Sequence, residues 1–499
     1  MAAEPTTWQD VYILLKNQVD LKAIEQQFLK EQVSPNERVR RLLLALQDQA
    51  QTQDPLRMWL NTQAEATNVE GFWVCNLITA RLKPELIEEV AKRTEVAQIS
   101  WQAPIIGDEY EYNQALAPFS VGGREPGHDA IAAPEMWELG YTGYGRKVLV
   151  IDSGVDPSHP ALADKYWGNY VPADEAWYHP GGTTSPLACD IHGTHVSGTV
   201  VGIDPAMQDT IGVAPGGVWM ASPAVGTSNG STCTAPLASV IGAFQWSLDP
   251  DGDPNTIDDM PDVINNSWST GPTPGSECNS VFVQVFDALE LAGIAAVFSA
   301  GNRGPGTSTI SPPKNIVTSP VNTFCVGMVF GDSPGFPIVN GSSRGPALCG
   351  NIGDNVFKPE VVAPGYLIRS SGLNGQYFNL TGTSMATPHV AGALLLLKEA
   401  FPDLTGTQLK YALYNSAVDL GNPGEDNVYG QGIINVKAAF DTLVAQGNVP
   451  QVISDANDAT LVEVNGLAEL LCDSIVQPQV IIGNEGNNPI SSLWIHWED

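Results

Sequence analysis

Three short segments, far apart in the chain, contain the groups needed for nucleophilic catalysis by a serine. Asp152 follows the apolar stretch Lys-Val-Leu-Val-Ile, His192 and His195 belong to His-Gly-Thr-His, and Ser384 lies in Gly-Thr-Ser-Met-Ala-Thr-Pro-His. A hydroxyl attacks a carbonyl when an imidazole takes its proton, and a buried carboxylate must fix the tautomer of that imidazole. The segments therefore predict acyl transfer on Ser384, oriented by Asp152. The spacing of the two histidines leaves the identity of the base open.

In the order Asp, His, Ser, these segments resemble the subtilases, and in particular their bacillopeptidase-F-like branch; the order is that of subtilisin itself. The resemblance implies a serine endopeptidase in which Ser384 is the nucleophile, His192 the general base and Asp152 the orienting carboxylate. His195 is then expected to be a buried, hydrogen-bonded residue near the sheet. Asp156, four residues beyond Asp152, is expected to be structural.

The anion that forms on a scissile carbonyl needs hydrogen-bond donors placed in advance. Asn302 ends Ser-Ala-Gly-Asn, and the resemblance makes its amide the oxyanion-hole donor together with the backbone N–H of Ser384. The alternative is an ordinary turn asparagine. A helix expected to begin at Ser384 would direct the positive end of its dipole at the same anion. Pro388 is expected in the first turn, where a missing N–H costs little.

An extended peptide substrate is expected to add a strand to exposed edges of the enzyme. By resemblance, these edges contain Thr232–Pro236 on one side and Ser267, Trp268 and Ser269 on the other. Two residues depart from the family pattern, which usually has Gly at both positions. Ile191 precedes the base, so the loop carrying His192 can be held differently. Ser269 places a side chain at the entrance of the pocket for the residue before the cut.

Cations are rare in the central part of the chain. Between Lys165 and Arg344, the Lys and Arg residues are Arg303 and Lys314 alone. Arg303 follows Asn302, and Lys314 ends Ser-Pro-Pro-Lys, which by resemblance forms another wall of the same pocket. Two cations at one rim would favour an Asp or Glu side chain before the cut. Alternatively, both point to solvent and balance nearby carboxylates.

One acidic loop has oxygen ligands at a spacing that suits calcium. Its candidate ligands are Asp249, Asp251, Asp253, Asn255, Asp258 and Asp259. Hard oxygen donors are what Ca²⁺ prefers, and Gly252 helps the loop to turn. We therefore expect structural Ca²⁺ here, with an acidic solvated loop as the alternative. The calcium site usual in the family is expected to be absent, because Ala161 follows Ser-His-Pro where a carboxylate would stand.

The elements that must position these groups read as an α/β fold. Apolar strands are expected at residues 147–151, 262–265, 293–299 and 324–328, and helices at 193–201, 237–247, 280–292, 384–400 and 407–416. Strands that alternate with helices predict a parallel sheet covered on both faces. The resemblance makes this the three-layer subtilisin-like catalytic domain, at residues 131–446.

Two further regions flank this domain. Residues 1–118 read as a small α+β unit, with helices at 36–51 and 84–93 and strands at 71–81 and 96–101. They resemble a subtilase pro-domain, which is a folding chaperone and inhibitor; a retained N-terminal domain is the alternative. A Gly- and Pro-rich linker runs to about residue 130 and suits a maturation cut. Residues 447–499 resemble the first half of an Ig-like β module, with strands expected at 480–482 and 490–497.

Composition limits the partners. The 499 residues have 43% hydrophobic and 16% charged residues and a formal net charge of −32. Such an acidic, globular chain repels nucleic acid, and no apolar run approaches the roughly 18 residues of a membrane span. The seven cysteines permit disulfides after export, with at least one of the five in the catalytic domain free or paired outside it.

These observations lead to one functional prediction. We expect a secreted, monomeric serine endopeptidase that is made as a zymogen, cuts protein and peptide substrates, and is inhibited by its own pro-domain. Residues 1–6 do not begin a secretion signal, so the signal is expected to lie outside this sequence. A subtilase-type peptide ligase would use the same residues and is the alternative. A catalytically silent binding module would require a missing catalytic group, and none is missing.

Overall fold

The computed structural model describes residues 7–102, 105–108, 111–116, 123–225, 236–270, 278, 281–350, 357–452, 459–465 and 479–484. The chain divides into two compact units, Met1–Val449 and Pro450–Asp499. Thr232, one of the predicted substrate-binding residues, lies outside the described residues.

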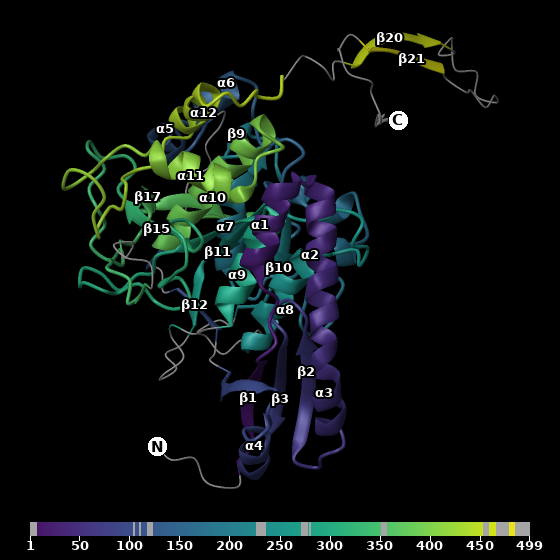
Figure 1. Ribbon diagram of the computed structural model, residues 1–499. Coiled ribbons are helices and arrows are strands. Elements are labelled where there is room, and N and C mark those ends of the chain that lie inside the picture. Colours follow the sequence, from purple (N-terminus) through teal and green to yellow (C-terminus); the bar gives the residue numbers. More distant parts are fainter. Residues whose placement is uncertain are drawn as a thin grey trace. The chain divides into compact units, whose positions relative to one another are not determined.

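A six-stranded parallel sheet lies at the centre of the larger unit (Figure 1). Its strands are, in spatial order, β10 (Val218–Ser222), β7 (Lys147–Ile151), β11 (Val263–Asn266), β13 (Ala295–Ser299), β15 (Phe324–Val329) and β17 (Val361–Pro364). Every residue of β7, β13 and β15 is buried. A parallel sheet needs such continuous apolar strands because helices cover both of its faces.

Two hydrophobic cores lie on the two faces of this sheet. Along β7, Val148 and Val150 belong to one core, whereas Leu149 and Ile151 belong to the other, as the alternation of side chains along a strand requires. The first core contains residues of α6 (Ala133–Glu138), α7 (Ile191–Val201), α10 (Thr383–Ala400), α11 (Gly406–Asn415) and α12 (Val436–Ala445). The second contains residues of α8 (Leu237–Ser247) and α9 (Phe282–Ala292). The α/β prediction is therefore confirmed, with each expected helix and strand of this sheet present to within two residues.

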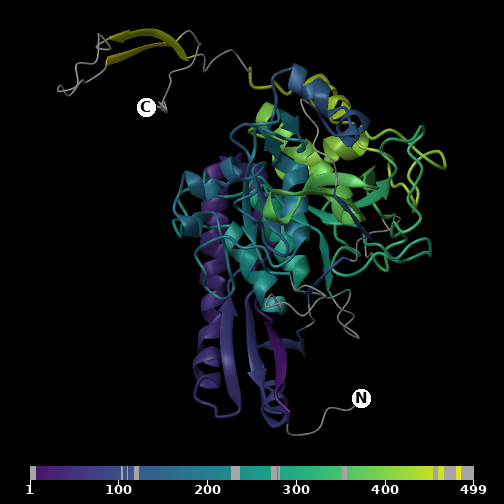
Figure 2. The ribbon, with the colours of Figure 1, turned by 180° about the vertical axis from the view of Figure 1, so that it is seen from behind.

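The N-terminal residues form a smaller antiparallel α+β region, drawn in purple and dark blue (Figures 1 and 2). Its sheet has the order β2 (Ala66–Phe72), β3 (Leu77–Leu82), β1 (Gln9–Leu15), β4 (Val96–Trp101). Its helices are α1 (Leu21–Glu31), α2 (Pro35–Ala50), α3 (Asp54–Leu60) and α4 (Pro84–Val90). Val39, Leu42 and Leu46 of α2 lie at helical spacing and pack into the core that contains α9. The Gln245 side chain of α8 accepts hydrogen bonds from two backbone N–H groups of the turn between β2 and β3.

One predicted strand of this region is wrong. Residues 71–81 were expected to form a single strand, but β2 ends at Phe72 and β3 begins at Leu77. Asn76 adopts a positive φ of 38°, a turn conformation that asparagine tolerates better than most residues. Its side chain donates to the Asn17 carbonyl at 2.7 Å and fixes the turn. The apolar residues on both sides of the turn therefore belong to two antiparallel strands.

Short strands border the central sheet. They are β5 (Ile105–Gly107), β6 (Glu111–Leu116), β8 (Ile203–Asp204), β9 (Asp209–Thr210), β12 (Trp268–Thr270), β14 (Ile316–Val317), β16 (Cys349–Gly350), β18 (Ile368–Ser371) and β19 (Tyr377–Thr381), with the helix α5 (Pro126–Ala130). Two of them come from the segment that joins the N-terminal region to the catalytic domain: β5 pairs with β12, and β6 pairs with β19, both antiparallel.

The smaller unit contains one described hairpin, in which β20 (Ala459–Asn465) pairs antiparallel with β21 (Gln479–Asn484). The strand expected from residue 480 is present within β21. The strand expected at 490–497 lies outside the described residues. The strand that pairs with β21 is β20, which the sequence pattern did not single out.

The described cysteines agree with the expectation that at least one cysteine of the catalytic domain is free or paired outside it. Cys278 and Cys349 form a disulfide, and Cys189 is also disulfide-bonded. Cys75 and Cys325 are free and buried. Within the described ranges, no helix is both long and apolar enough to cross a membrane.

Candidate active site

Asp152 and His192 form a buried hydrogen-bonded pair. Asp152 follows the last residue of β7, and its Oδ1 lies 2.8 Å from His192 Nδ1 and also accepts the Ser153 N–H at 2.7 Å. His192 belongs to the first turn of α7, which packs closely on the turn after β7. A Cβ at Gly193 would lie 2.2 Å from the Gly154 carbonyl oxygen, so only glycine permits this approach. Local sequence thus brings the carboxylate and the imidazole together.

The electrostatics of this pair suit a base. Burial opposes a charge on the imidazole, but the charge and hydrogen bond of Asp152 outweigh it and raise the pKa of His192 above its ordinary value. The Asp190 and Asp108 carboxylates act in the same direction. With Asp152 at Nδ1, the Nε2 atom is the position at which the ring can take up a proton.

Ser384 lies in the first turn of α10, fully buried, and its Oγ forms no hydrogen bond with the residues that the structure describes. The prediction for Pro388 is wrong. Because α10 begins at Thr383, Pro388 lies inside the helix rather than in its first turn. Its missing N–H removes the helical partner of the Ser384 carbonyl. The Ser267 hydroxyl donates to that carbonyl instead, at 3.3 Å, and so links the serine to the strand β12.

Asn302 is anchored to the same helix. Its side-chain oxygen accepts the backbone N–H of Thr383 at 2.9 Å and the Thr383 hydroxyl at 3.0 Å. The Thr383 hydroxyl in turn accepts the Gly301 N–H at 3.0 Å. Since the amide oxygen is engaged, the NH₂ group is the part of this side chain that can donate to an oxyanion. The structure therefore brings Asn302 to the residue that precedes Ser384.

Among the predicted edge residues, Ser267, Trp268 and Ser269 lie in or next to β12, and the chain's own β5 occupies this edge. Gly107 pairs with Trp268, and the N–H of Asp108 donates to the Ser267 carbonyl at 3.4 Å. The Asp108 side chain is buried and accepts hydrogen bonds from the hydroxyls of Ser269 and Ser299. Neither Asp108 nor Ser299 was predicted from the sequence as a site residue.

The two predicted pocket cations differ. Lys314 is fully buried, and its Nζ lies 2.5 Å from Asp108 Oδ2. Arg303 is exposed, and no ion pair joins its side chain to another described residue. Of the two cations, therefore, only Lys314 points inward, toward the predicted pocket.

Comparisons with known proteins agree with this geometry. Residues 143–432 match the model of the subtilase family. The chain belongs to the subtilase family. Bacillopeptidase F of Bacillus subtilis is 33% identical over 424 residues, which are 79% of this chain and 28% of that protein. Subtilisin NAT of Bacillus subtilis subsp. natto is 32% identical over 370 residues, which are 74% of this chain and 81% of that protein. A subtilisin of Bacillus pumilus is 33% identical over 315 residues, which are 63% of this chain and 97% of that protein.

The chain thus spans less than a third of the length of bacillopeptidase F and most of the length of the subtilisins. As a subtilase, it is a serine peptidase whose substrates are peptides. The branch named from the sequence and the antiparallel N-terminal α+β region agree with these matches.

Residues set aside in the sequence analysis have structural contacts in this subtilase. His195 is buried, its Nε2 lies within 3.1 Å of the Ile368 and Phe378 carbonyls, and burial lowers its pKa to about 3. Asp156 accepts the N–H and hydroxyl of Ser158. Ile191 is the first residue of α7, so the departure from Gly leaves His192 in the first helical turn.

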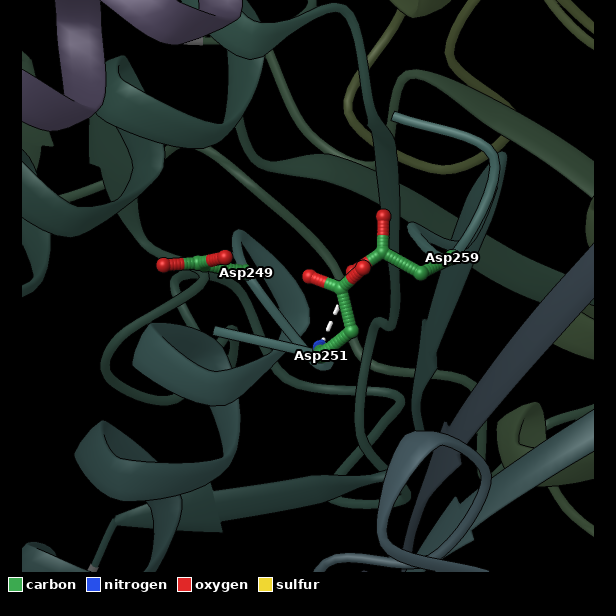
Figure 3. Close-up of side chains that lie close together, drawn as sticks. All are labelled: Asp249, Asp251 and Asp259. Atoms are coloured by element: carbon green, nitrogen blue, oxygen red, sulfur yellow. Dashed lines mark hydrogen bonds between the residues drawn. The ribbon is translucent and has the colours of Figure 1, made fainter. Parts of the chain in front are cut away.

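Three of the predicted calcium ligands lie together. One carboxylate oxygen each of Asp249, Asp251 and Asp259 lies within 4.8 Å of the others, and Asp259 Oδ2 accepts the Asp251 N–H at 3.1 Å (Figure 3). The Oδ1 atoms of Asp249 and Asp259 are buried and have no hydrogen-bond partner among the described residues. Burial and neighbouring carboxylates raise the pKa of Asp259 to about 6.

The other predicted ligands are not part of this group. Asp253 Oδ1 accepts the N–H and side-chain amide of Asn255. Asn255 Oδ1 accepts a hydrogen bond from Arg40 of α2 at 3.2 Å. Asp258 lies outside the group of three. The cluster of Asp249, Asp251 and Asp259 could hold a metal ion, because its oxygen donors are those that hard cations prefer.

Proposed function

We propose that this subtilase is a secreted endopeptidase made as a zymogen, in which Ser384 is the nucleophile, His192 the general base and Asp152 the orienting carboxylate. His192 Nε2 takes the proton of Ser384 Oγ while this oxygen attacks the scissile carbonyl. The Asn302 amide and the Ser384 backbone N–H stabilise the resulting oxyanion. The imidazolium then protonates the leaving amine, and water hydrolyses the acyl-enzyme with His192 again as base.

The observation that carries this proposal is the buried Asp152–His192 pair at 2.8 Å. Such a pair holds Nε2 ready to accept a proton, and it raises the pKa of the imidazole. The helix that carries Ser384 also adds the positive end of its dipole. A catalytically silent module would have no need for either arrangement.

The zymogen proposal is supported by the strand β5. It pairs with β12 as an extended substrate would, at the edge expected to bind peptides. The antiparallel region formed by β1–β4 is thereby connected directly to the chain that occupies this edge. We therefore assign residues 1–118 as the pro-domain that inhibits the enzyme until it is cut, and residues 131–446 as the catalytic domain. Residues 447–499 remain proposed as part of a β module.

Export and calcium complete the proposal. The Cys278–Cys349 disulfide is typical of proteins that fold in an oxidising compartment. We assign Ca²⁺ to the cluster of Asp249, Asp251 and Asp259, where it would supply the partner that two buried carboxylate oxygens lack among the described residues. Its role there is structural, because the cluster belongs to a loop and not to the catalytic residues.

Labelling with a biotinylated organophosphonate, followed by peptide mapping, tests the nucleophile. We expect a single adduct on Ser384 in the matured protein and none in the Ser384→Ala variant. The same variant should also stay full-length, whereas the parent chain shortens. An adduct on another residue, or a full-length parent with full activity, would contradict the proposal. Product analysis with and without an added acceptor amine separates hydrolysis from the alternative, peptide ligation.

A further inference from the structure

The structure assigns Asp108 as the residue before the maturation cut and Lys314 as the residue that makes this peptidase select acidic side chains. This inference rests on the proposed function and deepens it by naming the substrate class. The cut would fall between Asp108 and Glu109, so that the released part of the proposed pro-domain ends at residue 108 and not at residue 118. Substrates would be peptides with Asp or Glu before the scissile bond.

The backbone contacts place Asp108 next to the nucleophile. Residues Ile105–Gly107 pair antiparallel with β12, and the N–H of Asp108 continues this pairing by donating to the Ser267 carbonyl. The hydroxyl of the same Ser267 donates to the carbonyl of Ser384. One serine thus bridges the two residues. The Asp108 carboxylate is also close enough to raise the pKa of His192.

Strand β6, which begins three residues after Asp108, pairs with a strand that leads directly to the nucleophile. Strand β6 begins at Glu111 and pairs antiparallel with β19, where Glu111 is opposite Thr381. Thr381 ends β19 and is separated only by Gly382 from α10, which carries Ser384. The strands β5 and β6 therefore flank Ser384 as the two halves of one extended substrate would. In the sequence, the bond between Asp108 and Glu109 falls between these two strands.

The pocket around the Asp108 side chain has the chemistry of an acid-binding site. Its hydroxyl donors are Ser269 on Oδ1 and Ser299 on Oδ2, and Lys314 Nζ forms an ion pair with Oδ2 at 2.5 Å. Burial opposes ionisation, but the Lys314 charge and these hydrogen bonds outweigh it and lower the pKa of Asp108. The carboxylate is therefore bound as an anion.

Lys314 explains why the pocket would select an acidic side chain of the substrate. It has no exposed surface, and its other partners are neutral oxygens, the Trp268 carbonyl and the Ser299 hydroxyl, each at 3.2 Å. A substrate that brings an anion supplies this cation with the counter-charge that its neutral partners lack, and is therefore favoured over one that does not. The Ser269 hydroxyl, at a position where the family usually has Gly, adds a donor to the same carboxylate.

Matched chromogenic peptides ending in Ile-Ile-Gly-Asp, Ile-Ile-Gly-Asn and Ile-Ile-Gly-Leu measure the preference on the matured enzyme. Because Asn has the shape of Asp without its charge, the Asp peptide should exceed the Asn peptide about 10- to 100-fold in kcat/KM. Lys314→Met should abolish most of this ratio. Arg303→Met is the matched control and should retain it. A parent enzyme that prefers Leu, or a ratio equally lost in both variants, would overturn the assignment.

The position of the maturation cut can be measured without substituting any residue of the pocket. The intact mass of the released N-terminal fragment should correspond to a chain ending at Asp108, and Asp108→Asn should slow its release. A fragment that ends elsewhere and is released at the same rate in Asp108→Asn overturns the inference. Failure of the proposed function is distinct, because then no peptide is cut and the organophosphonate does not label Ser384.

Discussion

Replacing Asp152 with Asn tests the part of the site that the structure defines best. The substitution keeps the shape of the side chain but removes the charge that lies 2.8 Å from His192 Nδ1. With charge centres about 4 Å apart and an effective permittivity of about 20, the imidazolium in the transition state loses roughly 4 kcal/mol of attraction. This corresponds to about 10³ in rate. Because an amide also fails to fix the tautomer, we expect kcat to fall by about 10³–10⁴.

The assay follows self-cleavage of the full chain by gel electrophoresis, and then peptide hydrolysis over a range of pH. The pKa of His192 is raised chiefly by Asp152 acting against burial, and the base must be neutral to act. The acidic limb of the kcat/KM profile should therefore shift to lower pH in Asp152→Asn. Asp156→Asn is the matched control, because Asp156 contacts the neighbouring Ser158 and not the imidazole. Parent-like cleavage by Asp152→Asn, or an equal loss in the control, would refute the reasoning.

Two further predictions concern the oxyanion and the metal. Asn302→Ala should lower kcat by about 10²–10³ with little change in KM, which is the size measured for the loss of this donor in subtilisin itself. Thr383→Val retains the amide donor of Asn302 and should lower kcat less. Similar losses of kcat in both variants would instead favour a role of Asn302 in anchoring α10. Calcium at about a hundredfold excess over its Kd should stabilise the protein by about 2.7 kcal/mol, seen as a higher melting temperature. Asp251→Ala should remove this effect and Asp258→Ala should not; equal melting curves in calcium and chelator would leave the cluster as acidic surface.

The sequence by itself determined the fold class and predicted the proposed catalytic groups. Strand β7 was predictable because it is an apolar run followed directly by Asp152, and helices α7 and α10 because His192 and Ser384 lie in recognisable motifs at their first turns. The approach of Asp152 to His192 also follows from local sequence, since the turn after β7 and the glycine that follows His192 allow the two segments to pack closely. Hydrophobic periodicity and short-range turns carry this information along the chain.

Other features depended on contacts between distant segments. The turn at Asn76 is stabilised by Asn17 and Thr52, so the apolar pattern alone suggested one strand instead of two. The loop that was expected to bind calcium offered six oxygen-bearing residues, and only folding separated Asp249, Asp251 and Asp259 from the rest.

The proposed specificity pocket also depends on contacts between distant segments. The scarcity of cations drew attention to Arg303 and Lys314, but sequence could not say which of them points inward. Lys314 and Asp108 form a buried ion pair although they are 206 positions apart in the sequence. The attraction between their charges is strong only because the folded pocket walls exclude water. Local sequence patterns therefore predicted the proposed catalytic groups, whereas tertiary packing alone decided that Lys314 meets Asp108 beside them.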